Sequence, residues 1–118
     1  WLGGTGWAWC AAFICWVFDE LALIHSLPFA KPEGAGAFWF EDWANQQGIK
    51  VLGKRAKIRK GDIVIFSFSH IGIASGNEKN NVFRCIEGNT NDGGSRDGDG
   101  VFEKNRSKSL VRSILRPF

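Results

Sequence analysis

Apolar residues recur at helical spacing in the first part of the chain. Over residues 10 to 24, apolar positions three and four residues apart predict an amphipathic helix that ends before Pro28. A second, shorter helix is predicted over residues 38 to 47, with Gly48 as its C-terminal stop. Residues 28 to 37 lie between them and contain two prolines and two glycines, which predicts a loop.

After Gly48 the pattern changes to short apolar runs that are typical of strands. Strands are predicted at residues 49–52, 62–68, 70–75, 82–87 and 110–116. Helices followed by consecutive strands with short connections indicate an α+β fold, with N-terminal helices packed on an antiparallel β-sheet. At 118 residues the chain can bury one core but not a second independent one, so residues 1–118 are predicted to form a single domain. Because it opens with Trp-Leu-Gly-Gly, we expect this domain to be excised from a longer chain.

Composition and charge limit the classes of partner. Six tryptophans and ten phenylalanines can fill a core, and some aromatics commonly line a groove. The formal net charge of +3 is too small for the dense basic patch of a nucleic-acid-binding protein. The basic runs at residues 54–57 and 104–108 are interpreted as solvated faces and loops. No apolar run is long enough to span a membrane.

The candidate nucleophile is Cys10, which follows Trp9 at the start of the first predicted helix. Unpaired backbone N–H groups and the helix dipole at that end favour a thiolate over a thiol. The Cys10 amide would then be the natural donor for an oxyanion. A cysteine beside a helix is by itself more often a small buried apolar residue. The catalytic interpretation therefore depends on partners elsewhere in the chain.

Those partners are predicted on two strands. His70 stands at the start of one strand, and Glu87 and Asn89 stand at the end of another. A thiol nucleophile needs an imidazole to take its proton and a third group to fix the orientation of that imidazole. Gly72 and Ala74 share the side of the strand on which His70 lies, so we expect open space on that side. All three roles therefore have a candidate.

The remaining cysteines and polar segments favour simpler interpretations. Three cysteines cannot all pair with one another, which argues against a disulfide scaffold, and Cys15 and Cys85 are predicted to fill the core. His25 is predicted to cap the first helix or to lie on the surface. No zinc-type spacing of cysteine and histidine occurs. Residues 89 to 100 combine oxygen ligands with glycines as calcium loops do, but they lack the EF-hand spacing, so a polar loop is favoured over a calcium site.

Four blocks of the sequence, in this order, resemble the CHAP domains, the cysteine- and histidine-dependent amidohydrolases and peptidases of bacterial and phage cell-wall lysins. The blocks are Trp9-Cys10-Ala11-Ala12-Phe13, Gly61-Asp62-Ile63-Val64-Ile65-Phe66, Ser69-His70-Ile71-Gly72-Ile73 and Ile86-Glu87-Gly88-Asn89-Thr90. The resemblance implies a papain-like fold and hydrolysis of an amide bond in peptidoglycan, with Cys10 as nucleophile and His70 as base and acid. It also implies that Glu87 orients the imidazole and that Asn89 is a further polar member of the site.

The resemblance also carries expectations about partners and metals. It implies a peptidoglycan substrate, action at the bacterial cell wall after secretion or release, and a flanking cell-wall-binding domain as a candidate partner, and we expect a monomer. Several family members carry an acidic calcium loop upstream of the cysteine, whereas here nine residues without a carboxylate precede it, so no metal or other cofactor is expected there. Trp7 and Trp9 are candidates for lining the substrate groove, and core packing is the alternative for both.

Two other functions fit the same residues. A non-catalytic module for binding cell walls or glycans would use the aromatics and the mild positive charge. An amidase acting on a small thiol conjugate, such as glutathionylspermidine, would use the same cysteine chemistry. Within peptidoglycan, muramoyl-alanine amidase and cross-bridge endopeptidase activities share one catalytic plan, and the sequence leaves the bond open.

Overall fold

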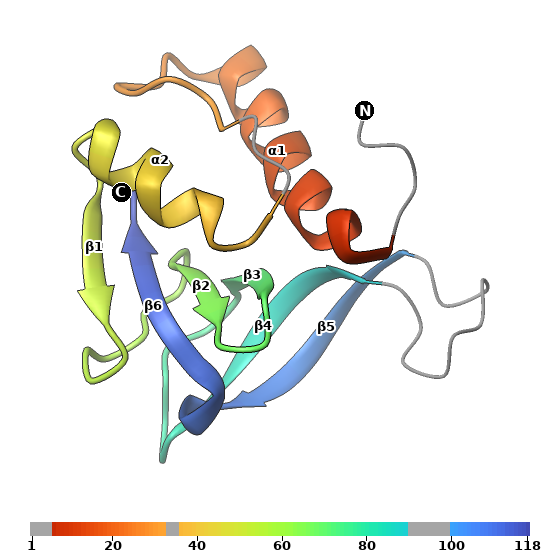
Figure 1. The fold of residues 1–118 in the computed structure, drawn as a ribbon, viewed down its shortest axis with the longest axis vertical. Coiled ribbons are helices and arrows are strands. Elements are labelled where there is room, and N and C mark those ends of the chain that lie inside the picture. The colour runs from red at the N-terminus through yellow and green to blue at the C-terminus, as the bar shows by residue number, and fades with distance from the viewer. Residues whose placement is uncertain (1–5, 33–35, 90–99) are drawn as a thin grey trace.

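Two helices form the N-terminal layer of the protein (Figure 1). The computed structural model describes residues 6–32, 36–89 and 100–118, with side chains for residues 10–32, 36–88 and 100–118. Helix α1 spans Gly6–Ile24, so it ends as predicted but begins four residues earlier. Helix α2 spans Trp39–Gln46. It is followed by Gly48, whose φ of 73° lies in the left-handed region that glycine adopts without strain.

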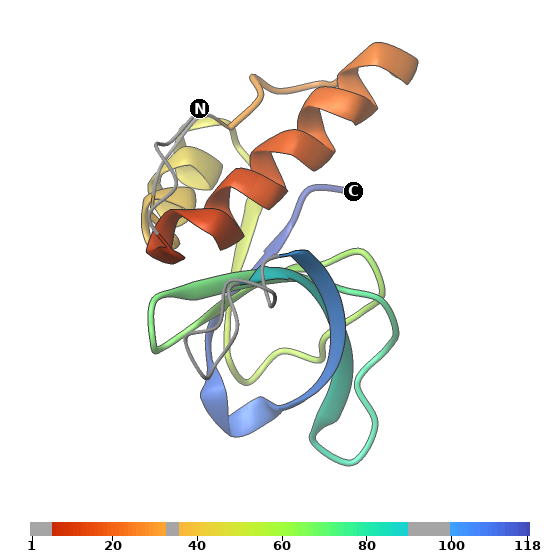
Figure 2. The same ribbon diagram turned by 90° about the vertical axis from the view of Figure 1, so that its right-hand side faces the viewer.

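The C-terminal layer is one antiparallel sheet with the strand order β1-β6-β2-β3-β4-β5. The strands are β1 (Lys50–Gly53), β2 (Ile63–Phe66), β3 (His70–Ala74), β4 (Val82–Asn89), β5 (Gly100–Ser107) and β6 (Val111–Arg116). Both helices lie on the same side of the sheet, and β4 and β5 bend strongly away from them (Figure 2). The predicted α+β class, with helices packed on an antiparallel sheet, is confirmed.

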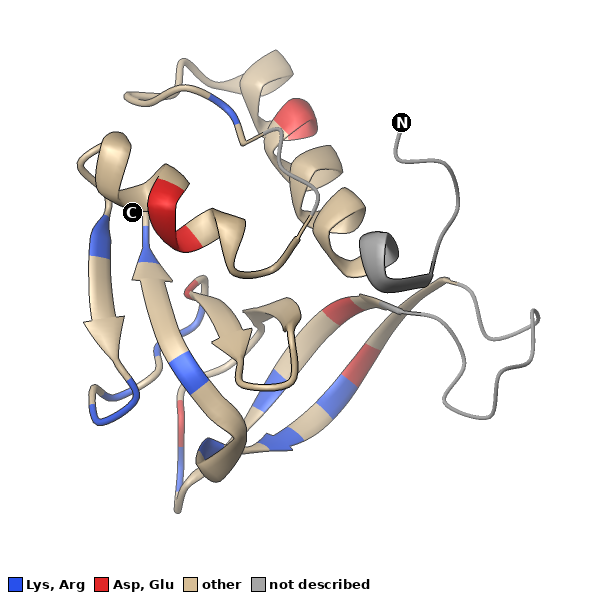
Figure 3. Cartoon of the chain, in the orientation of Figure 1, with Lys and Arg blue, Asp and Glu red and all other residues tan. Residues whose placement is uncertain are grey.

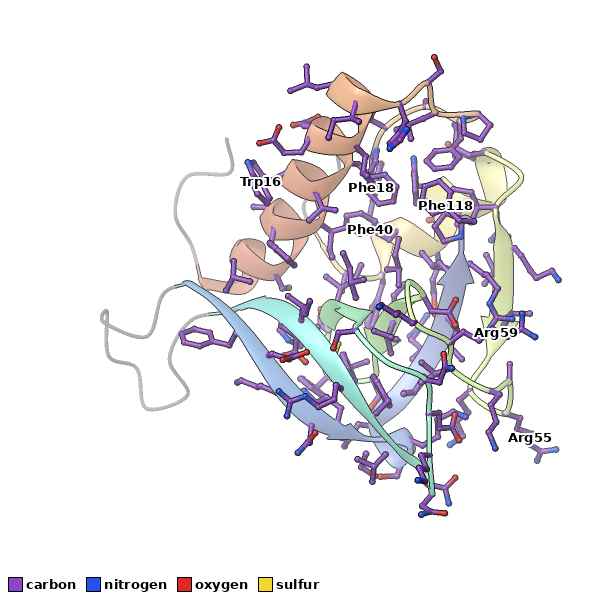
Figure 4. All side chains as sticks on the ribbon, turned by 180° about the vertical axis from the view of Figure 1, so that it is seen from behind. Trp16, Phe18, Phe40, Arg55, Arg59 and Phe118 are labelled. Carbon is purple, nitrogen blue, oxygen red and sulfur yellow. The ribbon has the colours of Figure 1, made fainter. Side chains whose placement is uncertain are left out.

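Alternate residues of the central strands face two separate apolar clusters. Ile71 and Ile73 of β3 pack with the helices, in the cluster that also contains Phe18 and Phe40. Figure 4 shows Phe18 and Phe40 on the inner side of the helices, whereas Trp16 points outward from α1 and is exposed. Ala74 belongs to the second cluster, on the opposite side of the sheet. The two sides of β3 therefore alternate as the sequence predicted, with His70 on the side of Ala74.

The sequence prediction missed strand β5 and the short 3-10 helix η2 (Lys108–Leu110) that follows it. Residues 104–108, interpreted from the sequence as a solvated run, lie in these two elements. Strand β5 pairs along its whole length with β4, from Val82 opposite Ser107 to Asn89 opposite Gly100. Its sequence is mostly polar and lacks the alternation of apolar residues that identifies a strand. Backbone pairing to β4, rather than apolar burial of its own side chains, explains this strand.

Candidate active site

Cys10 lies on α1 and its thiol is hydrogen-bonded to the imidazole of His70. The two residues come from opposite layers of the fold, and both are buried, with 4% and 7% of their surfaces exposed. Because α1 begins at Gly6, Cys10 is its fifth residue and not its first. Only the first four amides of a helix lack a helical partner, so the prediction that the Cys10 amide donates to an oxyanion is wrong for this structure.

His70 is the first residue of β3, directly after a tight turn from β2. Ser69 precedes it with a φ of 61°, the left-handed conformation common at the last position of such three-residue hairpin turns. The imidazole stacks on the ring of Phe68, with centroids 5.5 Å apart and 13° between the planes. The ring of Phe66 lies 5.7 Å from it on the buried side. The turn and the two phenyl rings therefore restrain the plane of the imidazole.

Glu87 reaches His70 across the pairing of β3 with β4. Its Oε1 lies 2.6 Å from Nε2 of His70. The register pairs Ile73 with Ile86 and Ala74 with Cys85, and one further step along it brings Gly72 opposite Glu87. A Cβ on Gly72 would lie 2.8 Å from Cγ of Glu87 and 2.5 Å from Sγ of Cys85. The prediction of open space beside His70 is therefore wrong, because side chains of β4 fill that space.

The charges of the three groups support one another. Burial disfavours a charged imidazole, but the hydrogen bonds and charges of Cys10 and Glu87 outweigh it and raise the pKa of His70 to about 9. Burial likewise disfavours a charged Glu87, yet Arg106 and His70 hold the pKa of this carboxyl at about 2. At neutral pH the arrangement therefore contains an imidazolium whose Nε2 lies next to the ionised carboxylate of Glu87, and Cys10 is the other hydrogen-bond partner of the imidazole.

Arg106 of β5 is a site residue that the sequence analysis missed. Its Nη2 donates to Oε1 of Glu87 over 2.6 Å, and its Nε donates to Oε2 over 2.7 Å. Its guanidinium also lies over the rings of Phe66 and Phe68, 5.3 and 5.5 Å from their centroids. The signal that could have indicated it is chemical, because a buried carboxylate requires a partner of opposite charge. The sequence alone offers fifteen basic residues for that role.

The other predicted residues lie in or near this site to different degrees. Cys85 is buried beside Glu87, and burial together with that carboxylate raises the pKa of its thiol, so it stays protonated. Cys15 packs at the border of the helix-facing core, as predicted. His25 is exposed, and its backbone N–H closes the last turn of α1 on the carbonyl of Leu21.

Several predictions fall on parts that the structure does not describe. The side chains of Trp7, Trp9 and Asn89 lie outside the described residues, and so do residues 90–99 of the candidate calcium loop. Within the described ranges, no cluster of three or more histidine, cysteine, aspartate or glutamate side chains is placed to hold a metal ion. The same part of the chain contains no helix with the length and apolarity needed to cross a membrane.

Charge is distributed unevenly between the two layers. Figure 3 shows acidic residues on both helices, whereas lysines and arginines are concentrated on the sheet and its connections. Figure 4 shows Arg55 and Arg59 at the end of the sheet far from α1, pointing outward. Residues 54–57 are mostly exposed, as predicted for this basic run. Of the two basic runs, only the second contributes to the site, through Arg106.

Comparison with known proteins identifies the family. A search of curated proteins found no match. The family model described as the CHAP domain matches residues 2–89, which include Cys10, His70 and Glu87 but end before β5. CHAP domains are hydrolases associated with amidase and peptidase activity on peptidoglycan. Since the match covers most of the chain, the protein belongs to the CHAP domain family.

Proposed function

We propose that this protein hydrolyses an amide bond in peptidoglycan, with Cys10 as nucleophile, His70 as general base and acid, and Glu87 as the residue that orients His70. Asn89 is included as a further polar member of the site. The observation that carries the proposal is the chain of contacts from the Cys10 thiol through the imidazole to a carboxylate that is completely buried. Inert core cysteines do not need such partners.

The proposed reaction has two stages. The Cys10 thiolate attacks the amide carbonyl and forms a C–S bond, and the imidazolium of His70 gives its proton to the nitrogen of the leaving amine as the C–N bond breaks. The neutral imidazole then takes a proton from water, which attacks the thioester. The C–S bond breaks, the carboxylic acid product leaves, and the thiolate and imidazolium are restored. Glu87 keeps Nε2 hydrogen-bonded throughout, so Nδ1 always faces the sulfur.

A peptidoglycan substrate is supported by the family and implies action at the bacterial cell wall. The bond is either the muramoyl-alanine amide or an amide of the peptide cross-bridge. Mass spectrometry of the fragments released from a defined peptidoglycan distinguishes them, because the first frees the lactyl carboxylate of the sugar and the amine of the alanine, whereas the second frees a carboxylate and an amine within the peptide cross-bridge.

The test is lysis of purified cell walls, followed by turbidity. Replacing Cys10→Ala should reduce the rate by several orders of magnitude while leaving the thermal unfolding midpoint near that of the wild type. Cys15→Ala is the matched control, since it removes a thiol from the same helix outside the contacts to His70, and it should lyse walls normally. Undiminished lysis by Cys10→Ala would refute the proposal.

Two results would direct attention to the other functions. If the wild type binds cell walls without lysing them, and Cys10→Ala binds them equally well, the protein is a binding module. If the protein hydrolyses small amides but does not lyse cell walls, it is an amidase for small thiol conjugates.

A further inference from the structure

The carboxylate of Glu87 has two partners, and only one of them belongs to the region that the family model matches. Oε1 accepts from His70 and from Nη2 of Arg106, both over 2.6 Å, and Oε2 accepts from Nε of Arg106. Arg106 stands on β5, beyond residue 89 where the match ends. The side chain of Glu87 has no exposed surface, and that of Arg106 is 18% exposed. This ion pair is therefore largely withdrawn from water.

The two-point contact determines how Glu87 can be oriented. The terminal torsion of a glutamate is broad and roughly two-fold, so a carboxylate held by one hydrogen bond can rotate away from that bond. The planar guanidinium binds both oxygens at once, which fixes the plane of the carboxylate. Within that plane, Oε1 is the oxygen directed at Nε2 of His70.

Aromatic rings fix the guanidinium in turn. Arg106 lies over Phe66 and Phe68, and Phe68 stacks on His70. Phe66 and Phe68 therefore contact both Arg106 and His70, the two side chains that bind the carboxylate of Glu87. Phe66 is fully buried, whereas Phe68 is half exposed, so the buried ring of Phe66 is the one that restricts the guanidinium.

We infer that Arg106 is a positioning residue for the proposed hydrolysis, acting through Glu87 to hold the imidazole of His70 toward Cys10. The inference rests on the function proposed above for these residues. Arg106 does not contact the thiol in this scheme. Its effect is transmitted by the orientation and the charge of the carboxylate.

The role predicts a specific pH dependence. Among the residues that the structure describes, the titratable and charged groups that face Glu87 are His70 from β3, Cys85 from β4 and Arg106 from β5, with Cys10 of α1 beyond His70. Because the Cys85 thiol stays neutral, Arg106 and His70 are the groups within the described part of the chain that keep the buried carboxylate ionised. Without the guanidinium, burial raises the pKa of Glu87. The carboxylate then takes up a proton at a higher pH and releases the imidazolium.

The experiment compares Arg106→Gln, Arg106→Lys and a control, Arg84→Gln, in the full chain. Arg84 is a suitable control because it forms an exposed ion pair with Glu103 between the same two strands, at 2.8 Å, outside the site. Two rates are measured against pH: kcat/KM for wall lysis, and alkylation of Cys10 by iodoacetamide, followed by mass spectrometry of the peptide that contains it. Alkylation reports the thiolate–imidazolium pair without any substrate.

For Arg106→Gln we expect kcat/KM at the optimum to fall roughly 10–100-fold, the range found for residues that orient the side chains holding a catalytic metal. The acid limb of both pH–rate profiles should move to higher pH by about one unit or more, which corresponds to the loss of one strong ionic partner of Glu87. Arg106→Lys should keep the acid limb because it keeps the charge, but its kcat should be reduced with KM little changed. Arg84→Gln should match the wild type in both profiles.

A uniform loss of rate at every pH would overturn the inference, since that result is expected of a merely structural residue. An unchanged kcat in Arg106→Lys would also overturn the inference. This second test remains decisive if Arg106→Gln does not fold. In a Glu87→Gln background, Arg106→Gln should leave the acid limb where it is, and a further shift there would show that Arg106 does not act through Glu87. If the wild type lyses no walls, the proposed function fails, and the alkylation profiles still decide the role of Arg106.

Discussion

Gly72 is the position at which the site is most sensitive to one added methyl group. Its missing side chain makes room for two residues of β4, because a Cβ there would lie 2.5 Å from Sγ of Cys85 and 2.8 Å from Cγ of Glu87. Non-bonded carbon atoms rest about 3.5–4.0 Å apart, so Gly72→Ala forces movements of roughly 1 Å. The carbonyl of Ile86, 3.1 Å from the same point, belongs to the backbone and cannot easily retreat.

Gly72→Ala is expected to lower both the stability of the fold and the rate of lysis. Overpacking a well-filled interior costs about 1–3 kcal/mol, which lowers Tm by roughly 4–12 °C in a domain of this size. A displacement of about 1 Å in a group that orients the catalytic histidine can cost roughly 100-fold in rate. Calorimetry and the turbidity assay measure the two components separately on the same preparation.

Two further variants make the prediction sharp. Gly53→Ala is the matched control: it changes another strand glycine around which a Cβ meets nothing within 4 Å, so Tm and rate should both be retained. Adding Cys85→Ala to Gly72→Ala removes the nearest obstacle and should restore part of the lost Tm. A Gly72→Ala protein with the Tm and lytic rate of the wild type would refute the claim that this glycine makes space for Glu87.

The remaining predictions concern pH and a structural ion pair. Because the pKa of His70 is raised from 6.5 to about 9, its stabilising contribution is complete below pH 6.5 and lost as pH rises through about 9. We therefore expect wall lysis and Tm to decline together around pH 9, in step with the NMR titration of the imidazole, and lysis that persists well above the measured pKa would contradict its role as an acid. Arg116 binds both oxygens of the buried Asp62 over 2.9 and 2.8 Å, so Arg116→Met should destabilise the fold by about 3–5 kcal/mol in chemical denaturation. The rate of Cys10 alkylation should be unchanged in this variant at temperatures where it is folded, since the pair lies outside the contacts of the site.

The elements that could be predicted from the sequence are those whose own residues bury apolar surface. Helix α2 and the strands β1, β2, β3, β4 and β6 were predicted to within a few residues, because apolar residues recur along them at the spacing of the element or, in β2, form a short continuous run. Strand β5 was missed because its side chains are mostly polar and show no alternation of apolar with polar positions. The start of α1 was misplaced because the apolar pattern begins at residue 10, whereas the backbone is helical from Gly6.

The catalytic residues of the site could be predicted from their chemistry, but the packing around Gly72 and the role of Arg106 could not. Cys10, His70 and Glu87 were selected because nucleophile, base and orienting group require those residue types, and the structure brings all three into contact. The role of Gly72 was misjudged, because the strand alternation reveals which residues share a side but not which neighbouring strand fills it. Arg106 could not be selected, since its partner is determined by the pairing of β4 with β5.

What the sequence determined by itself is therefore local: the helical and extended segments, the sides on which residues of one strand lie, and the presence of a thiol, an imidazole and a carboxylate in a fixed order. Those properties follow from periodicity and from residue chemistry, which act over a few neighbouring positions. Only the tertiary structure decided that Glu87 passes through the space left by Gly72, that Arg106 binds it, and that Phe66 and Phe68 contact both the arginine and the histidine. Contacts between strands depend on register and on the bending of the sheet, which are properties of the whole fold and of no single segment.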